Sequence, residues 1–146
     1  PDIPCLKIKA DDMKVDLRLV QPVPFHAEEI IRWFEVNKSD PVWLCPNSVS
    51  TGPMSTDAIA QRCRNFSKLW GYRDILGNKD YVVPHGFRAT FKTWAEETIP
   101  NAERNVIESI LAHSLGGQED TYMRGDYFIK KKDYLSRWGD YVTSAL

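Results

Sequence analysis

Apolar residues recur at helical spacing in five segments of this 146-residue chain, and Pro or Gly interrupts the pattern between them. Side chains three and four positions apart share one face of an α-helix, so each segment predicts a helix with one apolar face. The chain should therefore build its core mainly from packed helices. The five predicted helices cover residues 25–37, 55–70, 86–98, 102–113 and 128–142.

The first twenty residues follow a different period. Apolar and charged residues alternate over 6–10 and again over 13–19, which is typical of strands. Pro22 and Pro24 follow the second run and end the pattern. We expect a hairpin or short meander before the first helix.

Residues 38–54 contain three prolines and a glycine and read as a loop, in which 42–44 could form a short strand. No internal repeat or linker divides the chain, and its length suits one domain with its own core. The predicted class is α+β, mainly α-helical with a small N-terminal antiparallel β-sheet, in a single domain over residues 1–146.

Composition excludes several classes of protein. Apolar residues make up 42% of the chain and charged residues 27%, so it is not a disordered or low-complexity sequence. The sequence has no apolar run long enough to cross a membrane and begins with no export signal. Cys5, Cys45 and Cys63 are odd in number and widely spaced, which favours reduced thiols over disulfides or a zinc site. We expect a cytoplasmic protein without a metal, a cofactor or a membrane partner.

The net charge of −1 hides an uneven distribution of charge. Residues 61–92 hold seven basic and two acidic side chains, residues 121–137 hold five and two, and the stretch between them is acidic. Basic blocks are often no more than solvated helix faces, so the pattern favours an anionic ligand only slightly.

A His and an Arg stand three residues apart at the start of the third predicted helix, in Val83-Pro84-His85-Gly86-Phe87-Arg88. Both would project from the first turn, where unpaired amide groups and the helix dipole also favour an anion. Taken alone, this pair is more typical of a capping His and a surface Arg.

A second group of residues follows in Leu111-Ala112-His113, with Tyr122 nine residues after the His. A tyrosine is a poor nucleophile at its free pKa of about 10, so an attacking Tyr needs cationic neighbours and proton acceptors. His85, Arg88 and His113 could supply them.

The ordered set His85-x-x-Arg88, Leu111-x-His113 and Tyr122 resembles the catalytic C-terminal domain of tyrosine recombinases, in particular prophage-type integrases of bacteria. The resemblance covers residues 14–141 and implies the fold of that catalytic domain. Its other similar segments are Met13-Lys14, Pro22-Val23-Pro24, residues 55–72, residues 122–127 and Trp138-Gly139-Asp140-Tyr141.

The resemblance implies roles for five residues in site-specific DNA recombination or integration. Tyr122 would attack the scissile phosphate and form a 3′-phosphotyrosyl link. Arg88 would clamp the non-bridging oxygens, and His113 would hydrogen-bond the same phosphate. His85 would assist proton transfer from the tyrosine, and Lys14 would protonate the departing 5′-oxygen. No small-molecule substrate is implied.

Other residues compete for two of these roles. Four other tyrosines compete with Tyr122, namely Tyr81, Tyr127, Tyr134 and Tyr141. The last three recur every seven residues, a helix-face period that favours packing, and this favours Tyr122 as the nucleophile. Lys14 lies in a predicted hairpin, where lysines also protect strand edges.

The resemblance also implies a first arginine, in a Gly-x-Arg-x-x-Glu segment that these 146 residues lack. We therefore expect an N-terminally truncated catalytic domain that is inactive by itself. Its partners would be double-stranded DNA and other integrase protomers on that DNA, with nucleoid association when bound. Two alternatives are a catalytically silent DNA-binding remnant or regulatory fragment, and a helical domain unrelated to DNA.

Overall fold

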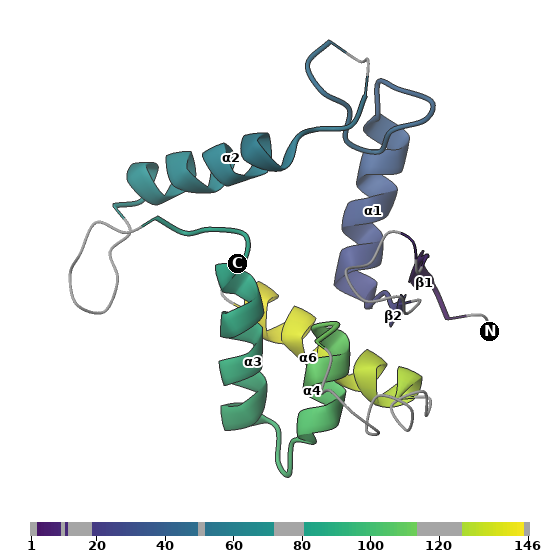
Figure 1. The fold of residues 1–146 in the computed structure, drawn as a ribbon, viewed down its shortest axis with the longest axis vertical. Coiled ribbons are helices and arrows are strands. Elements are labelled where there is room, and N and C mark those ends of the chain that lie inside the picture. The colour runs from purple at the N-terminus through teal and green to yellow at the C-terminus, as the bar shows by residue number, and fades with distance from the viewer. Residues whose placement is uncertain are drawn as a thin grey trace. The chain divides into compact units, whose positions relative to one another are not determined.

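The computed structural model describes residues 3–9, 11, 19–49, 52–71, 81–113 and 127–144 (Figure 1). These ranges confirm a mainly helical α+β class with a small antiparallel sheet, while the recombinase fold stays a prediction. The elements are β1 (Cys5–Ile8), β2 (Leu19–Pro22), α1 (Phe25–Asn37), α2 (Thr56–Leu69), α3 (Gly86–Thr98), α4 (Arg104–Ile110) and α6 (Phe128–Thr143).

Internal contacts divide the chain into two compact units. The first unit comprises Pro1–Ile31 with Phe91–Leu146, and the second comprises Arg32–Thr90. The boundaries fall inside helices α1 and α3, so two helices run from one unit into the other. The single-domain organisation stays a prediction.

The sheet of the first unit pairs β1 with β2 in antiparallel register, with Cys5 opposite Pro22 and Ile8 opposite Leu19. Pro22 has no amide proton to donate, and it stands at the last position of its strand, where it is fully buried. The next residue restores the pairing, because the Val23 amide donates to the carbonyl of Pro4 at 2.9 Å. An antiparallel strand pair before the first helix is therefore confirmed, while residues 12–18, which hold most of the second predicted run, lie outside the described residues.

Four of the five predicted helices are confirmed within one or two residues at each end. In α2 the Oγ of Ser55 caps the first turn by accepting from the Ala58 amide at 3.2 Å. Trp70 is the C-cap, and Gly71 follows with φ of 63°, a conformation that glycine adopts without strain. Local capping chemistry thus placed both ends of this helix.

The fourth predicted helix is shorter than residues 102–113, because α4 covers only Arg104–Ile110. Asn101 precedes it with φ of 55°, and Ala112 follows it with φ of 51°. Both residues have left-handed backbone conformations, which a right-handed helix cannot include. The prediction was wrong at the N-terminal end because Glu103 is the N-cap and has an extended backbone. It was wrong at the C-terminal end because the apolar residues Leu111 and Ala112 belong to the turn that ends the helix.

The strand considered at 42–44 is absent from the structure. The Asp40 carboxylate accepts from the amides of Val42 at 2.7 Å and Trp43 at 2.9 Å, which folds this segment into a turn. These hydrogen bonds also lower the pKa of Asp40, with the Trp43 amide as the larger cause.

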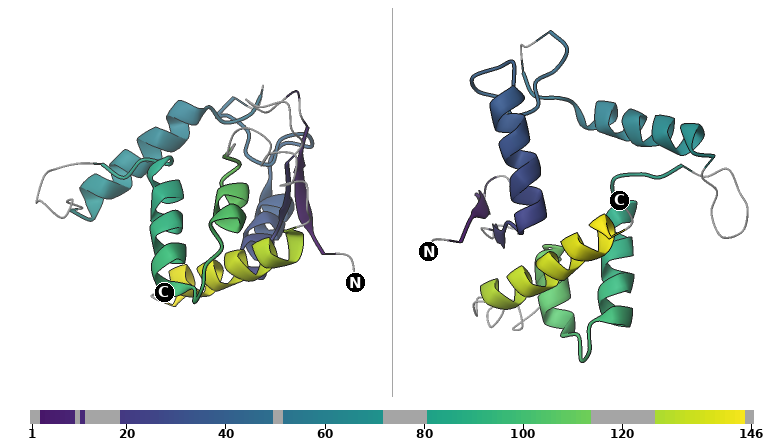
Figure 2. Two further views of the ribbon diagram at one scale, coloured as in Figure 1. Left: turned by 60° about the horizontal axis from the view of Figure 1, so that its bottom comes forward. Right: turned by 180° about the vertical axis from the view of Figure 1, so that it is seen from behind.

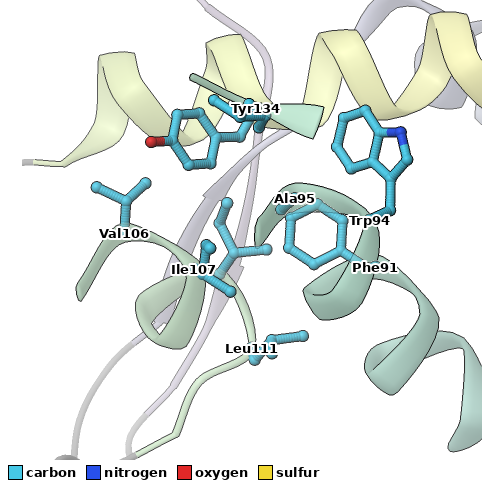
Figure 3. Close-up of a cluster of buried hydrophobic side chains, with 9 residues drawn as sticks. Phe91, Trp94, Ala95, Val106, Ile107, Leu111 and Tyr134 are labelled. Carbon is cyan, nitrogen blue, oxygen red and sulfur yellow. The ribbon is translucent and has the colours of Figure 1, made fainter. Parts of the chain in front are cut away.

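Figure 3 shows the core of the first unit, where α3, α4 and α6 meet. Ala95, Val106 and Ile107 are almost completely buried at its centre. Apolar burial of this kind supplies most of the stability of a small helical unit. The buried set is Phe91, Trp94, Ala95, Ile99, Val106, Ile107, Ile110, Leu111 and Tyr134.

Helix α6 crosses α3 and α4, as the two views in Figure 2 show, and its packing within the chain is confirmed. The Trp138 ring lies 5.1 Å from that of Trp94 and 5.7 Å from that of Phe91, centroid to centroid. Gly139 permits a close approach to α1, since a Cβ there would lie 2.5 Å from Nδ1 of His26. The aromatic stripe and the glycine beside it therefore fix α6 on the first unit.

Tyr134 also makes a polar contact that its aromatic packing brings within reach. Its hydroxyl accepts from the amide of Glu103, the N-cap of α4, at 3.0 Å. The Glu103 side chain makes no capping hydrogen bond, and the Tyr134 hydroxyl pairs with this amide at the helix start instead.

We expect Tyr134→Phe to lower the free energy of unfolding by about 1 kcal/mol, because it removes the partly buried hydrogen bond to the Glu103 amide. Tyr141→Phe on the same helix is the matched control: this side chain is 55% exposed, and its loss of a hydroxyl should change stability by less than about 0.5 kcal/mol. Urea denaturation measures both variants. Equal effects would contradict the capping role.

Candidate functional site

The described residues include three of the five predicted site residues. His85 immediately precedes α3, Arg88 lies in its first turn, and His113 follows α4. His85 and Arg88 belong to the second unit and His113 to the first. Lys14 and Tyr122 lie outside the described residues.

The start of α3 uses its amide groups in a tight turn. The amide of Gly86 donates to Val83 at 2.9 Å, that of Phe87 to Pro84 at 3.3 Å and that of Arg88 to His85 at 3.2 Å, in each case to the carbonyl. The expectation of unpaired amides was wrong for these three residues. An anion at this end of α3 would therefore depend on side chains, of which His85 is exposed and Arg88 is partly buried.

Helix α2 holds the segment that leads into α3, within the second unit. The buried hydroxyl of Ser67 donates to the Cys63 carbonyl and accepts from the Val82 amide, both at 2.8 Å. The Lys68 ammonium lies 5.5 Å from the centre of the Tyr81 ring, a cation–π contact. These contacts position the chain just before His85.

A pocket of about 360 Å³ lies beside this hydrogen bond. Its lining is apolar except for the Ser67 hydroxyl, so it offers little to a phosphate group. Two of its walls, Val82 and Phe87, flank His85 in sequence, and the pocket thus belongs to the packing that supports the start of α3. The lining residues are Cys63, Phe66, Ser67, Trp70, Val82 and Phe87.

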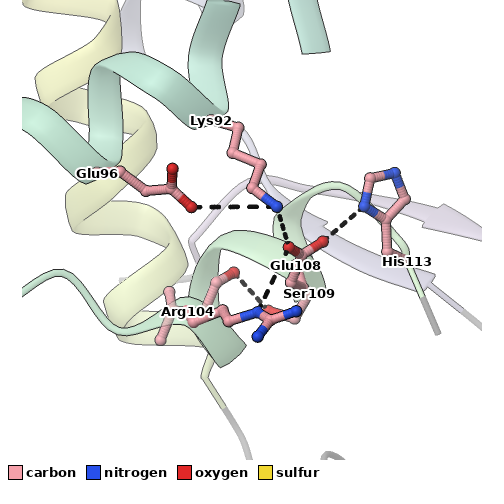
Figure 4. A network of polar contacts seen from close by, with 7 residues as sticks. Lys92, Glu96, Arg104, Glu108, Ser109 and His113 are labelled. Atoms are coloured by element: carbon pink, nitrogen blue, oxygen red, sulfur yellow. Dashed lines mark hydrogen bonds and ion pairs between the residues drawn. The ribbon is translucent and has the colours of Figure 1, made fainter. Parts of the chain in front are cut away.

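In the first unit, a charged network surrounds the carboxylate of Glu108 (Figure 4). The Glu108 side chain is only 5% exposed. Nζ of Lys92 lies 2.5 Å from its Oε1, and Nδ1 of His113 lies 2.6 Å from its Oε2. Two weaker contacts at 4.0 Å join Arg104 to Glu108 and Glu96 to Lys92.

Burial alone would raise the pKa of the Glu108 carboxyl, because a low-dielectric environment disfavours its charge. Hydrogen bonds from Lys92 and His113, together with their positive charges, outweigh burial and hold the pKa of Glu108 below its ordinary value. The carboxylate is therefore ionised at neutral pH, and it accepts hydrogen bonds on both oxygens.

The main chain holds His113 against the same residue. The amide of His113 donates to the carbonyl of Glu108 at 3.0 Å, and the amide of Ala112 donates to that of Ser109 at 3.3 Å. This pair of bonds around a left-handed residue is a Schellman motif, which ends α4 and turns the chain. Glu108 thus fixes His113 through its carbonyl and through its carboxylate, while the imidazole side chain stays 46% exposed.

Comparison of the chain with protein-family models, curated proteins and solved structures gave no match. The likeness to tyrosine recombinases therefore rests on the residues of the chain itself. Over the described ranges, no helix is long and apolar enough to cross a membrane. The same ranges contain no group of three or more His, Cys, Asp and Glu side chains arranged to hold a metal ion.

Sequence reasoning missed Lys92 and Glu108. It grouped Lys92 with a basic block and Glu108 with an acidic stretch, as if both were solvated. A signal for Glu108 was present, because a single acid interrupts the apolar run from Val106 to Leu111 and lies five residues before His113. An acid in such a run is buried when the helix packs, and it then needs a cationic partner.

Ala112 adopts a left-handed conformation that costs a residue with a Cβ roughly 1 kcal/mol. We expect Ala112→Gly to leave stability unchanged or raise it by up to about 1 kcal/mol, the greater freedom of glycine in the unfolded chain offsetting part of the gain. Ala89→Gly, on the exposed side of α3, should instead destabilise by about 1 kcal/mol. Thermal denaturation compares them, and a clear loss of stability in Ala112→Gly would contradict the strain argument.

The lowered pKa of Glu108 predicts a pH dependence of stability. A carboxyl whose pKa is lower in the folded state stabilises the fold above its unfolded value, near 4.5, and loses this contribution as pH falls through the folded value. The difference in unfolding free energy between the unaltered chain and Glu108→Gln should therefore shrink as pH falls from about 5 to about 3. Glu96→Gln, at a half-exposed carboxylate, should show a smaller change. A difference for Glu108→Gln that stays constant with pH would contradict the ion-pair network.

Proposed function

We propose that this chain is part of the catalytic domain of a tyrosine recombinase, an enzyme that cleaves and rejoins DNA through a 3′-phosphotyrosyl intermediate. The observation that carries the proposal is that Lys92 and His113 bond the same carboxylate. Arg88 precedes Lys92 by four residues in α3, and residues four apart share a helix face. The proposal takes Arg88, which precedes Lys92 by one helical turn in the sequence, and His113 to serve one phosphate.

The proposed reaction exchanges one phosphodiester for another. The phenolic oxygen of Tyr122 attacks phosphorus, the bond from phosphorus to the 5′-oxygen breaks, and a 3′-phosphotyrosyl link and a free 5′-hydroxyl result. The phenol gives its proton to His85, and Lys14 protonates the departing oxygen. Arg88 and His113 stabilise the charge that develops on the non-bridging oxygens. The phosphotyrosine retains the bond energy, so attack by a 5′-hydroxyl can rejoin the strand.

The charges of α2 support a DNA backbone as the anionic partner. Arg62 and Lys68 are exposed on this helix, and Arg64 is partly buried beside Gln61. By contrast, Lys130 of α6 is paired with Glu103 at 2.6 Å, and Arg137 is paired with Asp133 at 3.0 Å. The basic block around α2 and α3 is thus a better candidate for phosphate contacts than that of α6.

We expect Tyr122→Phe to abolish a covalent protein–DNA adduct while leaving DNA affinity nearly unchanged, because one hydroxyl contributes little to affinity. The protein is expressed from its full reading frame and incubated with nicked duplexes tiled across the DNA that flanks its gene. A nick beside the cleavage site lets a short fragment diffuse away and so traps the adduct, which denaturing gels detect.

Tyr127→Phe is the matched control. This residue is partly buried and packs against the core, as the seven-residue stripe predicted, so its ring matters more than its hydroxyl. The adduct should survive this change. An adduct lost with Tyr127→Phe and kept with Tyr122→Phe would refute the assignment of the nucleophile.

The same assay separates the alternatives. Salt-dependent binding of duplex DNA without any adduct would contradict strand transfer and favour a catalytically silent DNA-binding chain. An absence of binding even at low salt would contradict the DNA proposal and favour an unrelated helical domain.

A further inference from the structure

Glu108 is a buried carboxylate to which the proposed reaction assigns no step. It lies between a cation on α3 and the imidazole of His113, and its two oxygens contact one group each. A carboxylate bonded to one ring nitrogen of a histidine determines which nitrogen carries the proton. The position of that proton in turn decides whether the other ring nitrogen, Nε2, can donate or accept a hydrogen bond.

We infer that Glu108 is a positioning residue that keeps a proton on Nδ1 of His113, so that His113 binds phosphate only as the doubly protonated imidazolium. The inference rests on the proposed function, since it takes His113 to contact the scissile phosphate. It assigns a role to Glu108 and predicts that the contribution of His113 to the reaction falls as pH rises.

The inference follows from the inventory of donors and acceptors. An ionised carboxylate only accepts hydrogen bonds, so Nδ1 of His113 must donate to Oε2 of Glu108 across the 2.6 Å contact. A neutral ring with its proton on Nδ1 has a lone pair on Nε2. Phosphate oxygens also only accept, so Nε2 can bond to one only after the ring takes up a second proton.

The surrounding charges keep Glu108 ionised. Lys92 donates to Oε1, and the guanidinium of Arg104 lies 4.0 Å away on the same side of the carboxylate. Among the described residues, the Glu96 carboxylate contacts Lys92, also at 4.0 Å. Phosphate binding at Nε2 of His113 therefore requires a proton on both ring nitrogens.

Two contacts with Glu108 restrict the orientation of the His113 ring. The backbone of His113 is held by its amide bond to the Glu108 carbonyl, and its side chain by the Glu108 carboxylate. Over the described ranges no hydrogen bond joins Nε2 to another residue, and the side chain is 46% exposed. The nitrogen that would meet a phosphate is therefore the one whose proton Glu108 controls.

Glu108→Gln should reverse the tautomer of His113. Lys92 can only donate, so it takes the amide oxygen of the new side chain and turns the amide NH₂ toward Nδ1. Nδ1 must then accept, and the neutral ring carries its proton on Nε2. This variant could hydrogen-bond a phosphate without a second proton.

The first experiment needs no DNA. Nitrogen-15 NMR of histidine-labelled protein identifies the protonated ring nitrogen, and His→Gln variants assign the signals of His26, His85 and His113. In the neutral ring, observed at high pH, the unaltered protein and the control Glu96→Gln should carry the His113 proton on Nδ1. Glu108→Gln should carry it on Nε2. A proton on Nε2 in the unaltered protein would overturn the inference whether or not the variant folds.

The second experiment measures the rate of adduct formation against pH. The rate of the unaltered enzyme relative to that of Glu108→Gln should fall on the order of tenfold between about pH 6 and about pH 9, because only the former needs the imidazolium. Ionisations shared by the two enzymes cancel in this ratio. Glu96→Gln should follow the unaltered profile. A ratio that does not change with pH would overturn the inference.

The two experiments fail in different ways. If the unaltered protein forms no adduct, the proposed function is wrong, and the NMR experiment still decides whether Glu108 holds the proton on Nδ1. If the adduct forms while His113 carries its proton on Nε2, the function stands and the role of Glu108 is wrong.

Discussion

Helix α4 depends on burial for its existence, and much of the candidate site depends on α4. It has only seven residues, fewer than an isolated helix needs to be stable in water. All six residues from Val106 to Leu111 are buried, against α3 on one side and Tyr134 of α6 on another. The packing of α3, α4 and α6 therefore positions α4 and, with it, His113 in the turn that follows.

The same burial carries the Glu108 carboxylate out of water. Removing a charge from water is costly, and a buried carboxylate persists only when cations and hydrogen-bond donors compensate. Lys92 and His113 provide both, from α3 and from the turn after α4. A network of this kind contributes less to net stability than to specificity, because the arrangement fails if either partner moves.

This link gives the proposed chemistry a physical basis that a list of motifs does not. A histidine that meets a phosphate must present a donor, and its other nitrogen decides whether it can. In the proposed site, the Glu108 carboxylate of α4 bonds the other nitrogen of His113, and Lys92 of α3 helps to keep that carboxylate ionised. The proposed phosphate site and the core of the first unit are thus continuous through Glu108.

Much of the fold could be read from the sequence because it depends on local rules. The period of apolar residues located α1, α2, α3 and α6, and the cap at Ser55 and the glycine at Gly71 marked both ends of α2. The seven-residue recurrence of tyrosines correctly predicted packing for Tyr127 and Tyr134. The candidate residues His85, Arg88 and His113 were chosen from their spacing together with the resemblance to tyrosine recombinases, and their roles stay predictions.

Tertiary structure decided what depends on contacts between distant segments. It shortened α4, since a left-handed Ala112 ends the helix while apolar residues continue. Residues 42–44 do not form the strand that was considered, because the Asp40 carboxylate accepts from the Val42 amide and folds the segment into a turn. It also paired Lys92 with Glu108 across sixteen residues, which no periodicity reports. Sequence determined which faces are apolar, whereas only packing determined which charges were buried together, because the cost of burying a charge depends on the partners that meet it.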